Sequence, residues 1–135
     1  MGIDKLYLTW EDFEKYANRC YQQIKDLKIE QIITPMYGGF YLADYLKRKL
    51  NVPLICVFKE MNVLQKLDYK TNLIVDDIYD TGKTIKDFND YLTHFNKEHT
   101  FYNCCLIERL SASLNTIHGF LEPSNKYIVF PWEEK

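Results

Sequence analysis

The chain has little of what marks nucleic-acid-binding or membrane proteins. Its 17 Lys and Arg are outnumbered by 19 Asp and Glu, giving a net charge of −2, so no basic surface or arm predicts nucleic-acid binding. No apolar run approaches the roughly 18 residues that a membrane helix needs, and no secretory signal peptide is visible at the start. We therefore expect a cytoplasmic protein without a membrane or nucleic-acid partner.

Cysteine, glycine and proline are also scarce. The four cysteines, Cys20, Cys56, Cys104 and Cys105, form no C-x-x-C motif. Neighbours in a strand point to opposite faces, so Cys104 and Cys105 are not expected to share a metal, and we interpret all four as small buried hydrophobes in a reducing compartment. With 5 Gly, 4 Pro and 47% hydrophobic residues over 135 positions, residues 1–135 are expected to form one folded domain.

Hydrophobic spacing predicts helices that alternate with short apolar strands. The expected helices cover 10–27, 40–50 and 83–95, and the expected strands cover 31–34, 53–58, 72–75, 101–107 and 126–130. This order indicates an α/β chain with a parallel sheet and helices on both faces. Ligands bind such sheets beyond the carboxyl ends of the strands, which points to the loops at 35–39, 76–84 and 107–111.

The segment at 73–85 reads Leu-Ile-Val-Asp-Asp-Ile-Tyr-Asp-Thr-Gly-Lys-Thr-Ile and combines an apolar strand with a helix start. Free backbone N–H groups of residues 81–84 favour an anion there. Thr81 and Thr84 add hydroxyl donors, and Gly82 allows a ligand to approach the backbone closely. This part of the segment is suited to a phosphate group.

Two carboxylates, Asp76 and Asp77, precede that phosphate-binding stretch. They are acceptors suited to a sugar cis-diol and to Mg²⁺. Phosphate donors at one end and diol acceptors at the other match a ribose 5-phosphate. A nucleotide P-loop is disfavoured, because it needs glycine five positions before Gly82, where Asp77 stands. A plain helix N-cap remains the simplest ligand-free alternative.

The 73–85 segment resembles the phosphoribosyl pyrophosphate (PRPP) motif of type I phosphoribosyltransferases: an apolar strand, two acids, two residues and Asp-Thr-Gly-x-Thr. Weaker similarity extends the resemblance over most of the chain. Ile-Ile-x-x-x-x-Gly-Gly-x-x-x-Ala at 32–43 and Tyr-Ile-Val-Phe-Pro-Trp at 127–132 resemble the bacterial xanthine-guanine phosphoribosyltransferase subgroup. The resemblance implies a single-domain phosphoribosyltransferase fold.

The resemblance also implies roles for individual residues. Residues matching Asp76 and Asp77 face the ribose hydroxyls and Mg²⁺. The stretch matching Asp80, Thr81, Gly82, Lys83 and Thr84 holds the 5-phosphate. In relatives that use 6-oxopurines, the acid matching Asp80 lies near purine N7 and is the candidate general base.

Two further groups complete the implied site. Tyr37, Gly38 and Gly39 match the loop that meets pyrophosphate. Tyr127 and Ile128 match residues that contact the base, and Arg109 is a candidate for the 6-oxo group. For Ile128, packing in the core is an equally good interpretation.

Three departures from the family pattern leave alternatives open. Met36-Tyr37 stands where relatives carry Arg or Lys, and the loop at 59–71, with Lys59, Lys66 and Lys70, is short. The stretch ending in Glu108-Arg109 is unfamiliar, and Glu108 is suited to an exocyclic amine. The first hypothesis is a Mg²⁺-dependent 6-oxopurine phosphoribosyltransferase that forms a homo-oligomer, a dimer or tetramer. The alternatives are a non-catalytic PRPP or nucleotide sensor and a transferase for another base.

Overall fold

The computed structural model describes residues 4–58, 65–112 and 116–133. Within these ranges, three α-helices, seven strands and two short 3₁₀ turns follow one another. They are β1 (Lys5–Tyr7), α1 (Trp10–Ile24), β2 (Gln31–Pro35), α2 (Phe40–Leu50), β3 (Leu54–Val57), β4 (Thr71–Tyr79), α3 (Lys83–Phe95), β5 (Thr100–Arg109), η1 (Leu110–Ala112), β6 (Ile117–Glu122), β7 (Tyr127–Val129) and η2 (Pro131–Glu133). All three predicted helices are present, although α1 ends at Ile24 rather than Leu27. In the described ranges, no helix is long and apolar enough to cross a membrane.

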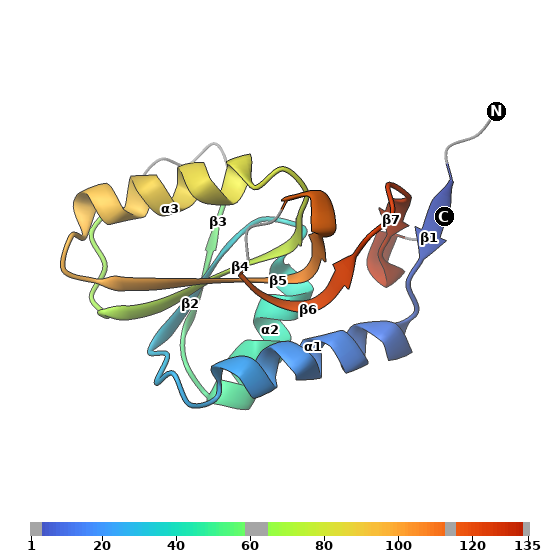
Figure 1. Ribbon diagram of the computed structural model, residues 1–135. Helices are drawn as coiled ribbons and strands as arrows, with labels where there is room; N and C mark the ends of the chain where they lie inside the picture. Colours follow the sequence, from blue (N-terminus) through green and yellow to red (C-terminus); the bar gives the residue numbers. More distant parts are fainter. Residues whose placement is uncertain (1–3, 59–64, 113–115, 134–135) are drawn as a thin grey trace.

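The main sheet is parallel and has the strand order β3-β2-β4-β5-β6. In Figure 1, α3 covers one face of this sheet, and α1 and α2 cover the other. This arrangement confirms the predicted fold class, a parallel-sheet α/β chain with helices on both faces. It also brings the ends of β2, β4 and β5 to one edge, because all three strands run in the same direction.

Local signals explain why the helices begin where they do. Thr9 caps α1: its side chain accepts from the Asp12 N–H at 3.0 Å, and the Asp12 carboxylate accepts from the Thr9 N–H at 2.9 Å. The second helix starts directly after Gly39 and ends at Leu50, where the C-cap residue Asn51 adopts a left-handed conformation. The glycine turn therefore fixes the start of α2 beside the end of β2.

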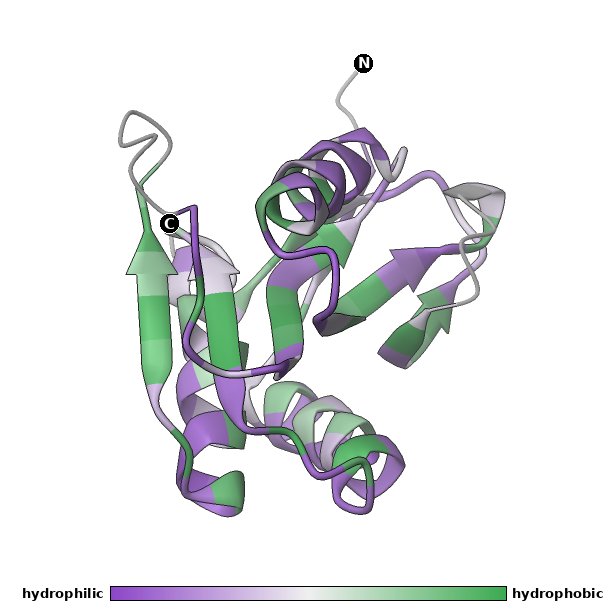
Figure 2. Ribbon diagram, turned by 90° about the vertical axis from the view of Figure 1, so that its left-hand side faces the viewer, coloured by the Kyte–Doolittle hydropathy of each residue, from purple (hydrophilic) through white to green (hydrophobic). Residues whose placement is uncertain are grey.

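The sheet divides the apolar side chains into two clusters. The larger lies beneath α1 and α2 and includes Cys20 and Cys104, whereas the smaller lies beneath α3 and includes Cys105. Figure 2 shows the apolar colour along the strands and the polar colour on the outer sides of the helices. Cys104 and Cys105 point to opposite faces as predicted. The prediction for Cys56 was wrong, since this residue is only half-buried on edge strand β3.

Three strand predictions need correction. The fifth strand of the main sheet is β6, which the sequence pattern did not reveal. The segment predicted at 126–130 is β7, but it pairs with β1 in a separate two-stranded sheet, Leu6 opposite Ile128. Finally, β4 does not end before the acids: it continues through Asp76 and Asp77 to Tyr79, paired with β5. The acids therefore lie within a strand rather than in a loop.

Candidate functional site

A cavity of about 260 Å³ opens where β4 passes into α3. Its lining is drawn from one continuous stretch of chain: Asp76, Asp77, Ile78, Tyr79, Asp80, Thr81, Gly82, Thr84 and Ile85. Both strand acids are half-buried, and each carboxylate accepts from the next N–H along the chain, Asp77 at 2.8 Å and Ile78 at 2.7 Å. The two carboxylates are thus held by backbone contacts at one end of the cavity.

The other end of the cavity is the start of α3. Gly82 precedes this helix with a φ of 83°, a left-handed conformation that glycine tolerates without steric cost. No side chain makes a capping hydrogen bond at the start of α3. The Lys83 N–H donates to the Thr81 hydroxyl, at the long distance of 3.3 Å. An uncapped helix start next to exposed threonine hydroxyls is a favourable site for an anion.

Lys83 does not direct its ammonium group into this cavity. The ammonium lies 2.7 Å from the Asp87 carboxylate one turn along α3, and both side chains are largely exposed. Lys83 therefore contributes its backbone N–H to the helix start, while its side chain forms a surface ion pair of small energetic value.

The glycine turn after β2 packs directly against the two acids. A Cβ atom at Gly39 would lie 2.8 Å from the Val75 carbonyl oxygen and 2.9 Å from the Asp76 Cα, and a Cβ at Gly38 would collide with the Asp77 carboxylate. The Thr34 hydroxyl donates to the same Val75 carbonyl at 2.8 Å. The predicted pyrophosphate loop therefore lies beside the acid pair.

Tyr37 belongs to the predicted pyrophosphate loop, at the position for which the family resemblance implies a cation. Its side chain is 72% exposed and makes an edge contact with Phe58, with ring centroids 5.5 Å apart. The Met36–Tyr37 peptide bond is cis. Among the loop residues with described positions, Lys66 and Lys70 are exposed, and Lys59 lies outside the described residues.

Arg109, at the end of β5, reaches the loop that follows β4. Its Nε lies 3.3 Å from an Asp80 carboxylate oxygen, and one Nη donates to the Ser124 carbonyl at 3.1 Å. The turn that carries Ser124 is itself held by Glu122, whose carboxylate accepts from the Ser124 N–H and hydroxyl. The candidate general base and the candidate 6-oxo contact are therefore direct neighbours, and sequence reasoning missed the supporting roles of Glu122 and Ser124.

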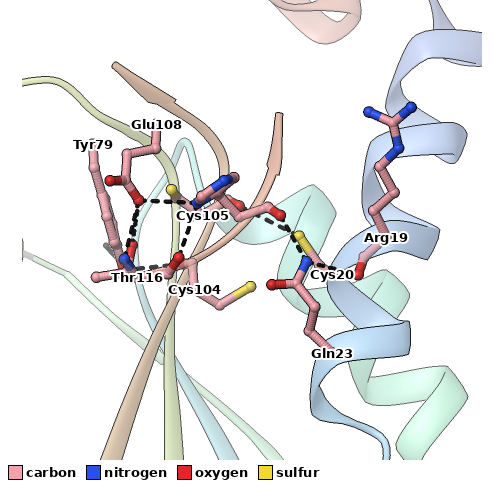
Figure 3. Close-up of polar contacts among 9 residues, drawn as sticks. Arg19, Cys20, Gln23, Tyr79, Cys104, Cys105, Glu108 and Thr116 are labelled. Carbon is pink, nitrogen blue, oxygen red and sulfur yellow. Dashed lines mark hydrogen bonds and ion pairs between the residues drawn. The ribbon is translucent and has the colours of Figure 1, made fainter. Parts of the chain in front are cut away.

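Glu108 is placed differently from Arg109. Its side chain is almost fully buried, and its carboxylate accepts from the Thr116 hydroxyl at 2.6 Å and lies 3.2 Å from the His118 Nδ1. Figure 3 shows this carboxylate turned towards Thr116, with Tyr79 and Cys105 beside it. Glu108 is not among the described residues that line the cavity. Its contacts are suited to joining β5 and β6 rather than to recognising an exocyclic amine.

The predicted base contacts at the C-terminal segment lie on the small sheet. Ile128 is buried in the larger core cluster, opposite Leu6 of β1. Tyr127 is exposed. Neither residue is in the described lining of the cavity beside the acids, so their base-binding roles stay predictions.

The ionisation of the acid pair reflects its surroundings. Burial, followed by the charge of Asp77, raises the pKa of Asp76 to about 8. Burial also raises the pKa of Asp77, and the Glu133 carboxylate in the C-terminal turn adds to that rise. Two carboxylates this close cannot both carry a charge cheaply at neutral pH unless a cation or donor joins them.

This environment predicts a pH dependence of stability in the ligand-free protein. The carboxyl group of an unfolded Asp has a pKa of about 3.9, whereas that of Asp76 in the folded protein is about 8. Between about pH 4 and 8 the folded state therefore holds one more proton than the unfolded state. The stabilising contribution is complete below that window and is lost as the pH rises through it, by up to about 5 kcal/mol, because each unit of pKa difference corresponds to about 1.4 kcal/mol. Urea unfolding with EDTA at several pH values should show the decline in the wild type, a flatter profile in Asp76→Asn, and a wild-type profile in the surface control Asp90→Asn. Equal slopes for wild type and Asp76→Asn would contradict the assignment.

The donor set at the acid pair fits a hard divalent cation that a ligand helps to hold. Asp76 and Asp77 supply carboxylate oxygens, and a cation would offset the burial that raises the pKa of both groups and the Asp77 charge that adds to the rise at Asp76. Within the described ranges, no group of three or more His, Cys, Asp or Glu side chains forms a cage for a metal. Mg²⁺ is commonly bound by one or two carboxylates together with substrate phosphates, which is the arrangement these two residues allow.

Comparisons with known proteins bear on the fold of the chain. No known family model matches the sequence. The ribose-phosphate pyrophosphokinase of Corynebacterium ammoniagenes is 31% identical over 101 residues, which are 68% of this chain and 32% of that protein, so the chain spans about a third of this curated relative. The purine phosphoribosyltransferase of Pyrococcus horikoshii superimposes with a TM-score of 0.86 at 26% identity, covering 98% of this chain and 97% of the other. The Helicobacter pylori xanthine-guanine-hypoxanthine phosphoribosyltransferase superimposes with a TM-score of 0.84 at 24% identity, covering 98% of this chain and 94% of the other.

The chain therefore has the type I phosphoribosyltransferase fold. Its structural neighbours are purine phosphoribosyltransferases, which are pentosyltransferases, and its sequence relatives are ribose-phosphate pyrophosphokinases. These findings confirm the resemblance at the level of the purine phosphoribosyltransferase fold. The narrower match to the bacterial xanthine-guanine subgroup remains a prediction.

Proposed function

We propose that this protein transfers the 5-phosphoribosyl group from PRPP to a 6-oxopurine base: guanine, xanthine or hypoxanthine. The observation that carries the proposal is the cavity between the Asp76-Asp77 pair and the uncapped start of α3, with the glycine turn at 38–39 packed against the acids. Carboxylates for ribose hydroxyls, N–H groups for a phosphate and a glycine turn for pyrophosphate occur together in the order in which PRPP presents these groups.

The neighbouring pair Arg109 and Asp80 supports a 6-oxopurine as the acceptor. Such a base presents the acceptors O6 and N7 side by side on one edge. The Arg109 guanidinium and the Asp80 carboxylate lie 3.3 Å apart. The guanidinium is a suitable donor to the oxo group, and the carboxylate is a suitable acceptor for the proton on the neighbouring ring nitrogen. An amino group at the same position would face the Arg109 donor and be disfavoured.

In the proposed reaction, a base nitrogen forms a bond to C1 of the ribose as the bond from C1 to pyrophosphate breaks. Asp80 accepts the proton that the base loses, and its 66% exposed carboxylate leaves it accessible to a ligand. The strand acids orient the ribose hydroxyls, and the start of α3 fixes the 5-phosphate, so that the reacting atoms meet without a covalent intermediate. Bound at the acid pair with PRPP, Mg²⁺ would neutralise charge on the departing pyrophosphate.

A second candidate function is a PRPP or nucleotide sensor that binds but does not turn over. The exposed Tyr37 supports this candidate, because it offers a hydroxyl where relatives place a cation for pyrophosphate. A third candidate is transfer to a different base. Glu108 is buried, so its carboxylate gives little support to recognition of an exocyclic amine.

We extend the main proposal to a single domain over 1–135 that works in the cytoplasm as a homo-oligomer, consistent with its free cysteines and with the exposed aromatics Tyr7 and Tyr127.

The proposal is tested by a product assay with mass spectrometry. The purified protein is incubated with PRPP and Mg²⁺ and with each of a panel of purine and pyrimidine bases. We expect a nucleoside monophosphate and pyrophosphate from a 6-oxopurine, and none from adenine. A product from another base would preserve the mechanism and refute the base assignment, whereas PRPP binding by calorimetry without any product would favour the sensor.

A further inference from the structure

Three aromatic rings form a continuous stack between the start of α2 and the C-terminal turn. Trp132 lies at the centre, with its ring centroid 4.5 Å from that of Tyr41 and 4.8 Å from that of Phe130. The interplanar angles are 11° and 9°, so the three rings are nearly parallel. Trp132 also makes an edge contact with the core residue Phe13, at 5.7 Å. The indole is therefore in contact with α1 and α2, which are distant in sequence, and with the neighbouring residue Phe130.

One end of this stack lies next to the glycine turn. Tyr41 belongs to the first turn of α2, two residues after Gly39. Gly39 is in turn pressed against the backbone of Val75 and Asp76, with no room for a side chain. A shift of Tyr41 would consequently move the loop at 35–39 relative to the strand acids.

The other end of the stack lies next to the C-terminal strand. Phe130 directly follows β7, which carries Tyr127 and Ile128, and it is buried in the core. The turn that joins it to Trp132 is closed by two hydrogen bonds of 3.0 Å between Phe130 and Glu133, one from each backbone N–H. The indole is thus rigidly connected to the segment proposed to contact the base.

We infer that Trp132 is a positioning residue, which holds the pyrophosphate loop at 35–39 and the base-binding segment at 127–128 in one fixed arrangement. This inference rests on the proposed function, because it concerns ligands that span those two segments. Packed side chains transmit such a constraint when both elements share the same rigid contact. Trp132 is not in the described lining of the cavity, so its proposed effect on a ligand passes through Tyr41 and Phe130.

Three ligands that occupy different parts of the site separate positioning from general destabilisation. Ribose 5-phosphate uses only the acids and the start of α3, PRPP adds the loop at 35–39, and GMP adds the base segment. Calorimetry with Mg²⁺ should show that Trp132→Ala weakens PRPP and GMP binding about tenfold, while ribose 5-phosphate affinity changes by less than about twofold. Trp132→Phe, which keeps a stacked ring, should restore most of the lost affinity.

Two further variants keep the test decisive. Tyr41→Leu breaks the stack from its more exposed end and should weaken PRPP binding about as much as Trp132→Ala does. It keeps the test decisive if Trp132→Ala folds poorly. Phe120→Leu removes a comparable stacked pair, Tyr16 with Phe120 at 5.1 Å, between α1 and β6, and should leave all three affinities unchanged. Equal losses for all three ligands, or none, in both stack variants would overturn the positioning role alone. Failure of the wild type to bind PRPP would overturn the proposed function and this inference together.

Discussion

Replacement of both strand acids, Asp76→Asn with Asp77→Asn, is expected to reduce PRPP affinity about a hundredfold or more. Each carboxylate would lose a charge-assisted contact worth about 1.5–3 kcal/mol, and two such losses correspond to at least that factor. The fold should persist, because each carboxylate accepts from the next backbone N–H along the chain, and an amide oxygen can accept the same hydrogen bond.

Calorimetric titration with PRPP and Mg²⁺ measures this loss, and far-UV circular dichroism checks the fold. The unliganded variant should in addition unfold at a higher temperature than the wild type, since two carboxylates with raised pKa values are removed from a half-buried site. Asp90→Asn on the exposed side of α3 is the matched control and should bind PRPP like the wild type. PRPP affinity that survives the double substitution would show that the ribose-phosphate site lies elsewhere.

Asp80→Asn is expected to reduce turnover about 10²–10³-fold while PRPP affinity changes by less than about threefold. The substitution removes the group that accepts the proton but keeps its size, and the contacts proposed for the 5-phosphate come from the N–H groups at the start of α3. The Asp80 carboxylate is exposed and pairs with Arg109 at 3.3 Å, so it is available to a base in the site. Turnover is measured by product formation, and PRPP affinity by calorimetry on the same preparation.

Arg109→Gln separates the two members of this pair. It should raise the KM for the base more than it lowers kcat, because Arg109 is proposed to bind the base and not to move a proton.

Equal losses of turnover and PRPP affinity in Asp80→Asn would assign that carboxylate to binding and leave the reaction without its general base.

Much of the fold could be predicted because its helices and central strands carry strong local signals. The Thr9–Asp12 capping box, the glycines before α2 and α3, and the apolar runs of β2, β4 and β5 each follow from the identity of neighbouring residues. The cavity could be located for the same reason, since its lining lies in one stretch from Asp76 to Ile85.

The remaining features depend on contacts between distant segments. The β6 strand is an edge strand with several half-exposed residues, so its pattern lacks the continuous apolar run of a central strand. Pairing of β1 with β7 joins Leu6 to Ile128, and no local pattern specifies a partner so far along the chain. The Arg109–Asp80 pair likewise required knowing that β4 and β5 are neighbours.

The extension of β4 through the acids was missed for a different reason. Acidic residues are depleted in strands, so Asp76-Asp77 was interpreted as the start of a loop. Ladder contacts with β5, with Asp76 opposite Cys105 and Tyr79 opposite Glu108, outweigh that preference. Pairing with β5 on either side of Asp77 thus keeps the acid pair within the strand.

The fit of Gly39 against Val75 and Asp76 provides a criterion for evaluating other chains of this fold. The atoms that a Cβ would meet at 2.8 and 2.9 Å belong to the backbone, and they cannot rotate away as a side chain would. A homologue with any larger residue at this position must have separated β2 from β4 or displaced its acid pair. Among divergent sequences that share the architecture, a glycine here is therefore a more discriminating marker of a retained sugar-phosphate site than an acidic pair, which any solvent turn tolerates.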